Sequence, residues 1–136
     1  MTTVSSQVYY DSVHAQRERM LFDGWTLAAL SSQLPSPSTL WVAQMSNQTV
    51  LLTRDETGVV RAFENSCLHR GTQIYSPQKG RNSWKGIPVE QVQCGYHGWK
   101  YNFRGAIQHI PKQTGIQCSE THLKQYAVFE DAGFIW

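Results

Sequence analysis

The arrangement of hydrophobic and polar residues predicts a short helix followed by many short strands. Within residues 12–22, Val13, Met20 and Leu21 recur at i, i+7 and i+8, the spacing of one helix face, and the first residue is a serine, a type that caps helices. We expect this helix to dock on another surface. Two prolines within residues 31–38 exclude a helix and predict an extended linker.

From residue 39 onward, β-branched, aromatic and long apolar residues form short groups separated by polar turns, several of which contain glycine. The pattern predicts strands at 39–45, 50–54, 59–65, 89–94, 98–103, 106–110, 126–130 and 134–136. The stretch 76–88, with its Gly, Pro, Lys and Arg residues, is predicted as a loop. We therefore expect residues 1–38 to form a helix and an extended leader, and residues 39–136 to form an all-β sandwich or barrel.

Length and composition fit one globular domain. The chain has 136 residues, of which 40% are hydrophobic and 16% charged, and its net charge of +2 does not indicate a nucleic-acid partner. No apolar stretch approaches the roughly 18 residues that span a bilayer, and the first residues lack a signal-peptide pattern, so we expect a cytoplasmic protein with no membrane partner. Three cysteines, an odd number, favour a metal or cluster role over a disulfide framework.

Two short motifs, CLHRG and CGYHGW, carry the candidate chemistry. The first contains Cys67 and His69 in the pattern C-x-H, and the second contains Cys94 and His97 in the pattern C-x-x-H. In an extended backbone, residues i and i+2 point to the same side, so we expect Cys67 and His69 to face one inorganic centre together. Four ligands from two loops would then converge.

Two kinds of centre suit these ligands. One is a Cys2His2 zinc site, and the other is a [2Fe–2S] cluster with two thiolates on one iron and two imidazoles on the other; the number of ligands leaves both open. Classical zinc fingers keep their cysteines in one half-site and their histidines in the other, whereas each motif here mixes the two, which favours the two-iron centre. Gly95 and Gly98 are expected to allow a tight loop at the second motif.

At these residues the chain resembles the Rieske domain of ring-hydroxylating non-haem iron oxygenases, as found in their alpha subunits. The resemblance covers NSCLHRG, CGYHGWKY and further segments, at 65–71, 94–101, 17–25, 53–65 and 104–111. It implies a Rieske-type antiparallel β-sandwich or barrel with a short N-terminal helix and a cluster-binding subdomain. Two loops, at about residues 65–72 and 92–101, would form that subdomain.

The resemblance also implies the site. Cys67 and Cys94 would bind one iron of a [2Fe–2S] cluster, and His69 and His97 would bind the other through Nδ1. Supporting residues would be Arg70, Gly71, Gly95, Gly98, Trp99 and Tyr101. Tyr101 is placed like a family position whose hydroxyl hydrogen-bonds a cysteine sulfur, with a core tyrosine as the alternative.

Arg70 would either contact an acidic group of a partner or brace its loop, and Trp99 would pack over the cluster and exclude water. The spacer between the two motifs is longer than is usual for the family. Respiratory-chain Rieske proteins carry a disulfide between the loops, whereas here Thr72 and Tyr96 occupy those places. We therefore expect a redox potential toward the low end of about −150 to +300 mV.

Other candidate residues are assigned no chemistry. Cys118 is interpreted as structural, and His14, His109 and His122 as surface or packing residues, because none has a partner at the spacing of a metal triad. The charges in residues 79–85 suggest a solvated loop, with a docking surface for a reductase or ferredoxin as the alternative.

The first functional hypothesis is the N-terminal Rieske domain of a longer oxygenase subunit, an oxidoreductase that forms trimers. The domain would relay single electrons from a ferredoxin or flavin reductase to a mononuclear Fe(II) for O2-dependent hydroxylation of an organic, aromatic-type substrate. That iron needs a catalytic domain absent from this sequence, so the chain alone is not expected to hydroxylate. Its end at Trp136, within an apolar segment, leads us to expect that the natural chain continues. A stand-alone Rieske ferredoxin is the alternative, and a zinc-stabilised interaction module is the minor one.

Overall fold

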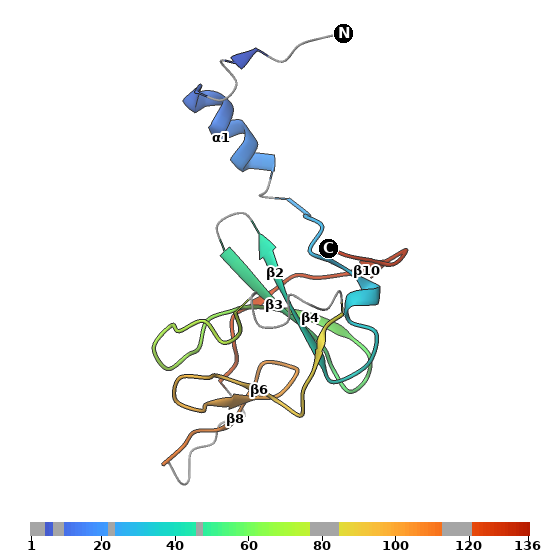
Figure 1. Cartoon of the computed structure of the whole chain (residues 1–136), viewed down its shortest axis with the longest axis vertical. Helices are drawn as coiled ribbons and strands as arrows, with labels where there is room; N and C mark the ends of the chain where they lie inside the picture. Colours follow the sequence, from blue (N-terminus) through green and yellow to red (C-terminus); the bar gives the residue numbers. More distant parts are fainter. Residues whose placement is uncertain (1–4, 7–9, 22–23, 46–47, 77–84, 113–120) are drawn as a thin grey trace.

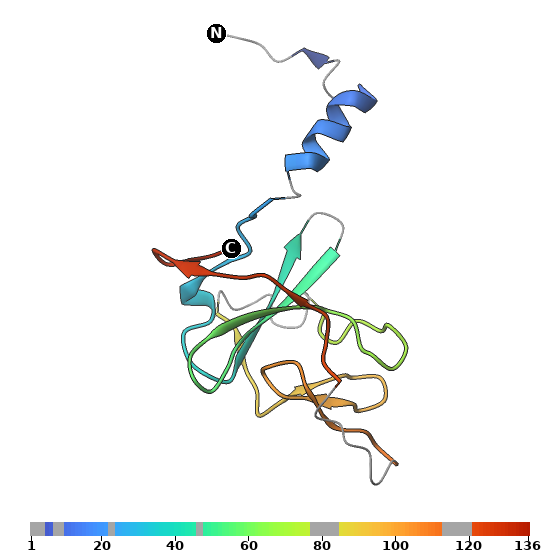
Figure 2. The same ribbon diagram turned by 180° about the vertical axis from the view of Figure 1, so that it is seen from behind.

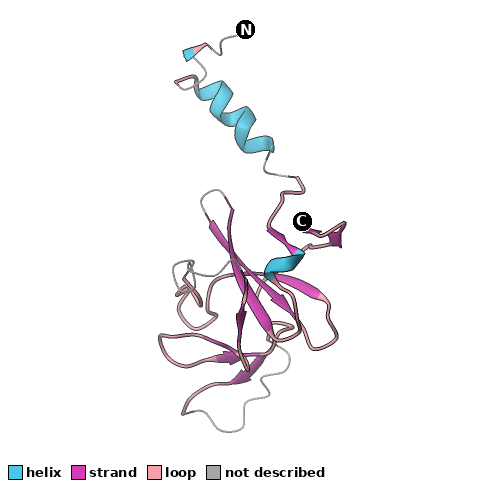
Figure 3. Ribbon diagram, turned by 45° about the vertical axis from the view of Figure 1, so that its right-hand side comes forward, coloured by secondary structure: helices cyan, strands magenta, loops and turns pink. Residues whose placement is uncertain are grey.

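Three antiparallel sheets form the body of the protein, as the computed structural model shows (Figure 1, Figure 3). The central sheet has the strand order β5 (Ile87–Pro88), β2 (Thr39–Met45), β3 (Gln48–Arg54), β4 (Val60–Glu64), β9 (Gln125–Tyr126). The loop sheet has the order β6 (Val92–Gln93), β7 (Lys100–Tyr101), β8 (Ile107–His109). The terminal sheet has the order β1 (Ala29–Leu30), β11 (Phe134–Ile135), β10 (Glu130–Asp131). The structure describes residues 5–6, 10–21, 24–45, 48–76, 85–112 and 121–136. The expected antiparallel all-β fold with one short helix is confirmed.

Strand β3 is the structural centre because both of its faces are covered. Its residues Val50, Leu51, Leu52 and Thr53 are all buried, although successive side chains of a strand point to opposite faces. Leu51 joins the core shared with the loop sheet, and Leu52 joins the core shared with the terminal sheet. The continuous apolar run of β3 is therefore the signature of a strand buried on both sides.

The core between the central and loop sheets also contains both motif cysteines. Its buried members are Leu40, Leu51, Phe63, Cys67, Ile74, Val92, Cys94, Tyr101, Phe103, Ile107, Ile110 and Leu123. Each of the two motifs is thus attached to this core through its cysteine. Apolar packing of this kind fixes side-chain positions closely.

The long strands were predicted well and the later ones only in part. The expected segments 89–94 and 98–103 contain only the two-residue strands β6 and β7, because the residues between them form a turn and not a continued ladder. The expected loop 76–88 contains β5, whose Pro88 lies opposite Thr39 of β2. Proline is tolerated there because β5 is an edge strand.

The segment before β2 is more structured than an extended linker. Ala29 of β1 pairs with Ile135 of β11, and residues Ser31–Gln33 form a 3-10 helix, η2. The expected absence of helix in residues 31–38 is wrong for these three residues. The 3-10 turn ends before Pro35, so the proline does not interrupt it. Leu34 is fully buried, and its carbonyl accepts a 2.6 Å hydrogen bond from Arg54 Nε.

Helix α1 (Ser12–Leu21) lies beyond the sheets in Figures 1 and 2. The side chain of Asp11 caps it by accepting a 2.9 Å hydrogen bond from Val13 N, so Asp11 fills the role that we expected of Ser12. Val13 is exposed. Among the described segments, no helix is long and apolar enough to cross a membrane.

A buried carboxylate closes the turn between β3 and β4. Asp55 is fully buried, and it accepts hydrogen bonds from Thr57 N and Oγ1, from Val59 N, and from Arg61 Nε. Burial acts to raise the pKa of Asp55, but these hydrogen bonds outweigh it and lower the pKa to about 2. The ionised side chain therefore stabilises the folded state above pH 4.

We expect Asp55→Asn to lower the free energy of unfolding at pH 7 by about 2 kcal/mol, the equivalent of the pKa shift. Because the folded pKa lies below the unfolded one, this contribution is present above pH 4 and is lost as the pH falls toward 2. Denaturant unfolding from pH 2 to pH 7 measures it. Asp131→Asn, at an exposed carboxylate, is the control. Equal pH dependence of the wild type and Asp55→Asn between pH 2 and 4 would contradict the assignment.

Candidate metal centre

The first motif forms a tight turn. Thr72 O accepts a 2.8 Å hydrogen bond from Cys67 N, and Cys67 O accepts a 2.8 Å hydrogen bond from Gly71 N. Gly71 has a φ of 67°, a left-handed conformation that favours glycine. The expected extended backbone from Cys67 to His69 is therefore wrong, because the chain turns at residues 68–70.

The second motif repeats this turn. Trp99 O accepts a 2.9 Å hydrogen bond from Cys94 N, and Cys94 O accepts a 3.1 Å hydrogen bond from Gly98 N. Gly98 has a φ of 73°, whereas Gly95 has no positive φ, and a Cβ at Gly95 would meet no atom within 4 Å. The expected need for glycine thus applies to the turn at Gly98 and not to Gly95.

The two cysteine side chains lie beneath the turns. Cys67 and Cys94 are both buried, carry free thiols and interact with each other. Burial raises the pKa of the Cys67 thiol, against a hydrogen bond with Tyr101 that lowers it. The Tyr101 hydroxyl lies 3.1 Å from Cys67 Sγ and accepts a 3.2 Å hydrogen bond from Leu68 N. Tyr101 is fully buried, so it both fills the core and contacts the sulfur, two roles that were posed as alternatives.

The two histidine side chains contact each other nearer the surface than the two buried cysteines. His69 Nδ1 and His97 Nδ1 are 3.1 Å apart. Trp99 stacks on the His69 ring with centroids 5.1 Å apart and planes 7° from parallel, and Tyr96 lies against His97 with centroids 3.9 Å apart. Partial burial and the charges of His97 and Arg70 lower the pKa of His69. Trp99, which we expected to pack over the cluster, thus packs on the ring of His69.

The four side chains are arranged as a buried sulfur pair and an outer imidazole pair. Within the described residues, no three His, Cys, Asp or Glu side chains are grouped as ligands of a single metal ion. Thiol and imidazole are donors that iron and zinc both accept. A centre with two metal atoms fits two pairs of donors, because each atom takes one pair.

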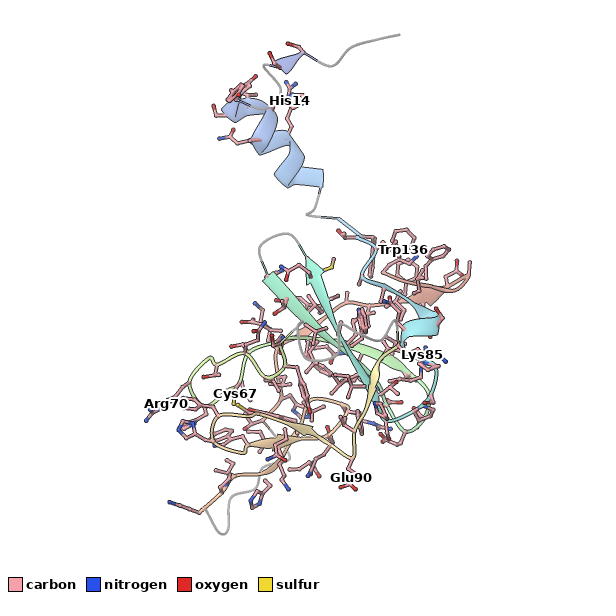
Figure 4. All side chains as sticks on the ribbon, viewed as in Figure 1. His14, Cys67, Arg70, Lys85, Glu90 and Trp136 are labelled. Atoms are coloured by element: carbon pink, nitrogen blue, oxygen red, sulfur yellow. The ribbon has the colours of Figure 1, made fainter. Side chains whose placement is uncertain are left out.

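The remaining sequence candidates lie outside this cluster. Arg70 is exposed beside Cys67, and His14 lies on α1, far from Cys67 in Figure 4. His109 and His122 are exposed, in keeping with surface residues. Cys118 and residues 79–84 lie outside the described residues, and Lys85 is exposed on a part of the molecule distant from Cys67 (Figure 4).

Sequence reasoning missed one polar contact of the site. The side chain of Asn65 binds the main chain of Tyr75, with Nδ2 donating to Tyr75 O at 2.7 Å and Oδ1 accepting from Tyr75 N at 3.1 Å. Asn65 was considered only as part of the resemblance. Its position two residues before Cys67 was the one available signal.

Known proteins are similar to this chain in sequence and in fold. The Rieske [2Fe-2S] domain family matches residues 24–127. The large oxygenase component of the 2,4-dinitrotoluene dioxygenase system of Burkholderia sp. (strain RASC) is 38% identical over 87 residues, which are 64% of this chain and 18% of that protein. The iron-sulfur subunit of the toluene-4-sulfonate monooxygenase system of Comamonas testosteroni is 35% identical over 113 residues, which are 82% of this chain and 29% of that protein.

A solved structure extends the similarity to the fold. Naphthalene 1,2-dioxygenase from Rhodococcus sp., bound to indole, superposes with a TM-score of 0.76 at 25% identity, covering 92% of this chain and 29% of that one. The chain thus spans less than a third of the length of these relatives. The match over most of its length shows that it belongs to the Rieske [2Fe-2S] domain family and is homologous to the N-terminal domain of ring-hydroxylating oxygenase alpha subunits.

Proposed function

We propose that this domain passes single electrons through a [2Fe–2S] cluster, with Cys67 and Cys94 on one iron and His69 and His97 on the other. The observation that carries the proposal is the layered arrangement of two free buried thiols beneath two imidazoles whose Nδ1 atoms are 3.1 Å apart. The same arrangement weighs against a zinc-stabilised interaction module, since a single zinc ion needs all four donors around one point.

The protein residues divide the work around the cluster. The cluster, when bound, supplies a couple that takes up and releases one electron. Because Cys67 and Cys94 are buried, their sulfurs are shielded from water. The Tyr101 hydroxyl accepts a hydrogen bond from Leu68 N, so its own proton is available for donation to Cys67 Sγ. The outer histidines, of which His97 is exposed, form the short path between the cluster and a partner surface.

The terminal sheet favours a domain of a longer subunit over a stand-alone ferredoxin. An apolar surface, here called the terminal patch, includes the exposed side chains of Trp25, Leu30, Phe129 and Phe134 and the partly exposed Trp136. Trp25 packs edge-on against Phe129, with centroids 4.7 Å apart. Contiguous exposed apolar surface usually marks a protein interface. Because the aligned part of this chain covers less than a third of each of these relatives, the proposed occupant is the catalytic domain of the same subunit.

Within that subunit, a ferredoxin or flavin reductase donates the electrons, and a mononuclear Fe(II) in the catalytic domain receives them. The subunit hydroxylates an organic, aromatic-type substrate with O2 and assembles as a homotrimer in the cytoplasm. Residues 1–38 serve as its leader and residues 39–136 as the electron-transfer domain. The names of the relatives, a dinitrotoluene dioxygenase system and a toluene-sulfonate monooxygenase system, support an aromatic substrate.

The gene distinguishes the oxygenase subunit from the carrier. We expect the coding sequence to continue beyond the Trp136 codon into a domain with two histidines and one carboxylate at the spacing of a mononuclear iron site. A stop codon directly after Trp136 would favour the diffusible carrier.

The ligand assignment predicts a spectroscopic loss. Cys67→Ser and His97→Ala should each abolish the visible absorption of the protein, because each removes a cluster ligand, and should lower its stability, since metal binding contributes to folding. Reduced wild-type protein should show the low average g value of mixed His and Cys ligation in its EPR spectrum.

Cys118→Ser and His109→Ala are the matched controls and should keep the wild-type spectrum. An unchanged spectrum in Cys67→Ser and His97→Ala, or an EPR signal of all-thiolate ligation, would sink the assignment. A colourless protein that holds one zinc ion and no sulfide would establish the zinc module instead.

Tyr101→Phe should lower the reduction potential by about 60 mV, which corresponds to a tenfold change in the equilibrium constant for one electron. The hydroxyl donates to a cysteine sulfur, and this hydrogen bond stabilises the more negative, reduced cluster. Spectroelectrochemical titration gives the potential. Tyr126→Phe, in the other core, is the control and should leave it unchanged. Equal potentials in both variants would show that the Tyr101 hydroxyl has no electrostatic role.

A further inference from the structure

One buried side chain closes the first ligand loop. Asn65 is 5% exposed, and its amide pairs with both backbone groups of Tyr75, ten positions later in the chain. This pairing imitates the two hydrogen bonds between residues of adjacent antiparallel strands. The segment from Asn65 to Tyr75, which contains Cys67 and His69, is thereby joined at its two ends.

The same loop is anchored to the central sheet through Thr49 of β3. Thr49 Oγ1 accepts a 3.1 Å hydrogen bond from Asn65 Nδ2 and a 2.9 Å hydrogen bond from Gln73 Nε2. One hydroxyl therefore holds residues from both ends of the loop against the strand that is buried on both faces. Opening the loop would leave the buried amide of Asn65 without its partners, which is costly.

Tyr75 extends the connection to the second ligand loop. Burial raises the pKa of its hydroxyl, and the nearby backbone of Gln93, the residue directly before Cys94, acts to lower it. Its partly buried ring packs against the core that contains both cysteines. The main chain of Tyr75 is thus bound to the first loop, and its side chain packs against the core that holds Cys94 of the second loop.

We propose that Thr49, Asn65 and Tyr75 form a clamp that keeps both ligand loops closed and so controls how long the cluster is retained. None of the three is a ligand; they are positioning residues that act through Cys67 and Cys94. The inference rests on the proposed cluster for its effect on iron retention, whereas the closure of the loops follows from the contacts alone.

Asparagine-to-aspartate substitutions test the clamp with a matched control. Asn65 uses Nδ2 to donate two hydrogen bonds, which Asn65→Asp removes. Asn102 uses Oδ1 to accept from Arg104 N and Ala106 N, a pattern that Asn102→Asp preserves while adding the same charge. We expect the cluster of Asn65→Asp to be released to an iron chelator about tenfold faster than that of Asn102→Asp or the wild type.

A second pair of variants separates the clamp from general loss of stability. Thr49→Val removes the acceptor shared by Asn65 and Gln73, and Thr39→Val removes a buried hydroxyl that donates to Ser36 O at 2.6 Å. Both should lower the unfolding midpoint by a similar amount. Only Thr49→Val should release the cluster faster. Equal release rates in the two variants would show that the network is merely structural.

Amide hydrogen exchange tests the loop closure whether or not iron is bound. In Asn65→Asp, the amides of Cys67, Gly71 and Gly98 should exchange about tenfold faster than in Asn102→Asp, with Leu52 unchanged. Should Asn65→Asp fail to fold, Tyr75→Phe replaces it, with Tyr126→Phe as its control, and should accelerate exchange mainly at Gly98. A wild-type protein without iron would refute the proposed function, whereas unchanged exchange in these clamp variants would overturn the clamp.

Discussion

The burial of two cysteine sulfurs in the main core, directly beneath two outward imidazoles, is the constraint on which the rest of the structure depends. A buried thiolate without compensation is costly, so the surrounding groups must supply hydrogen bonds and a counter-charge. Tyr101 meets part of that need from inside the core, since its hydroxyl reaches Cys67 Sγ while its ring packs with Phe63 and Leu51. A bound metal centre would provide the positive charge.

The two loops that contain Cys67 and Cys94 have the same backbone turn. Each places its cysteine at the first position of a turn and a left-handed glycine four residues later, at Gly71 and Gly98. The histidine stands two residues after the cysteine in one loop and three in the other, yet the two Nδ1 atoms are 3.1 Å apart. The difference of one position is accommodated within the turns, because the backbone hydrogen bonds that close them are the same. Each loop therefore contributes one donor to each layer of the site.

Local patterns in the sequence predicted what local interactions determine. Cys67, His69, Cys94 and His97 were found from their spacing, and the long strands β2 to β4 from their β-branched and apolar residues. The backbone at Cys67 was predicted wrongly because the side-chain rule for extended chains ignores the closing glycine. Long-range pairings were not accessible: nothing near Ala29 indicates that it pairs with Ile135, and nothing near Asn65 indicates Tyr75 as its partner. Those contacts depend on the path of the whole chain.

Strand β3 connects the site to the opposite end of the domain. Thr49, near its start, binds the first ligand loop, and Arg54, at its end, binds Leu34 O and the carboxylate of Glu130 at 2.6 Å. Between them the strand is buried on both faces, so it transmits position with little bending. The distance between the ligand loops and the terminal sheet is thereby set by one rigid element.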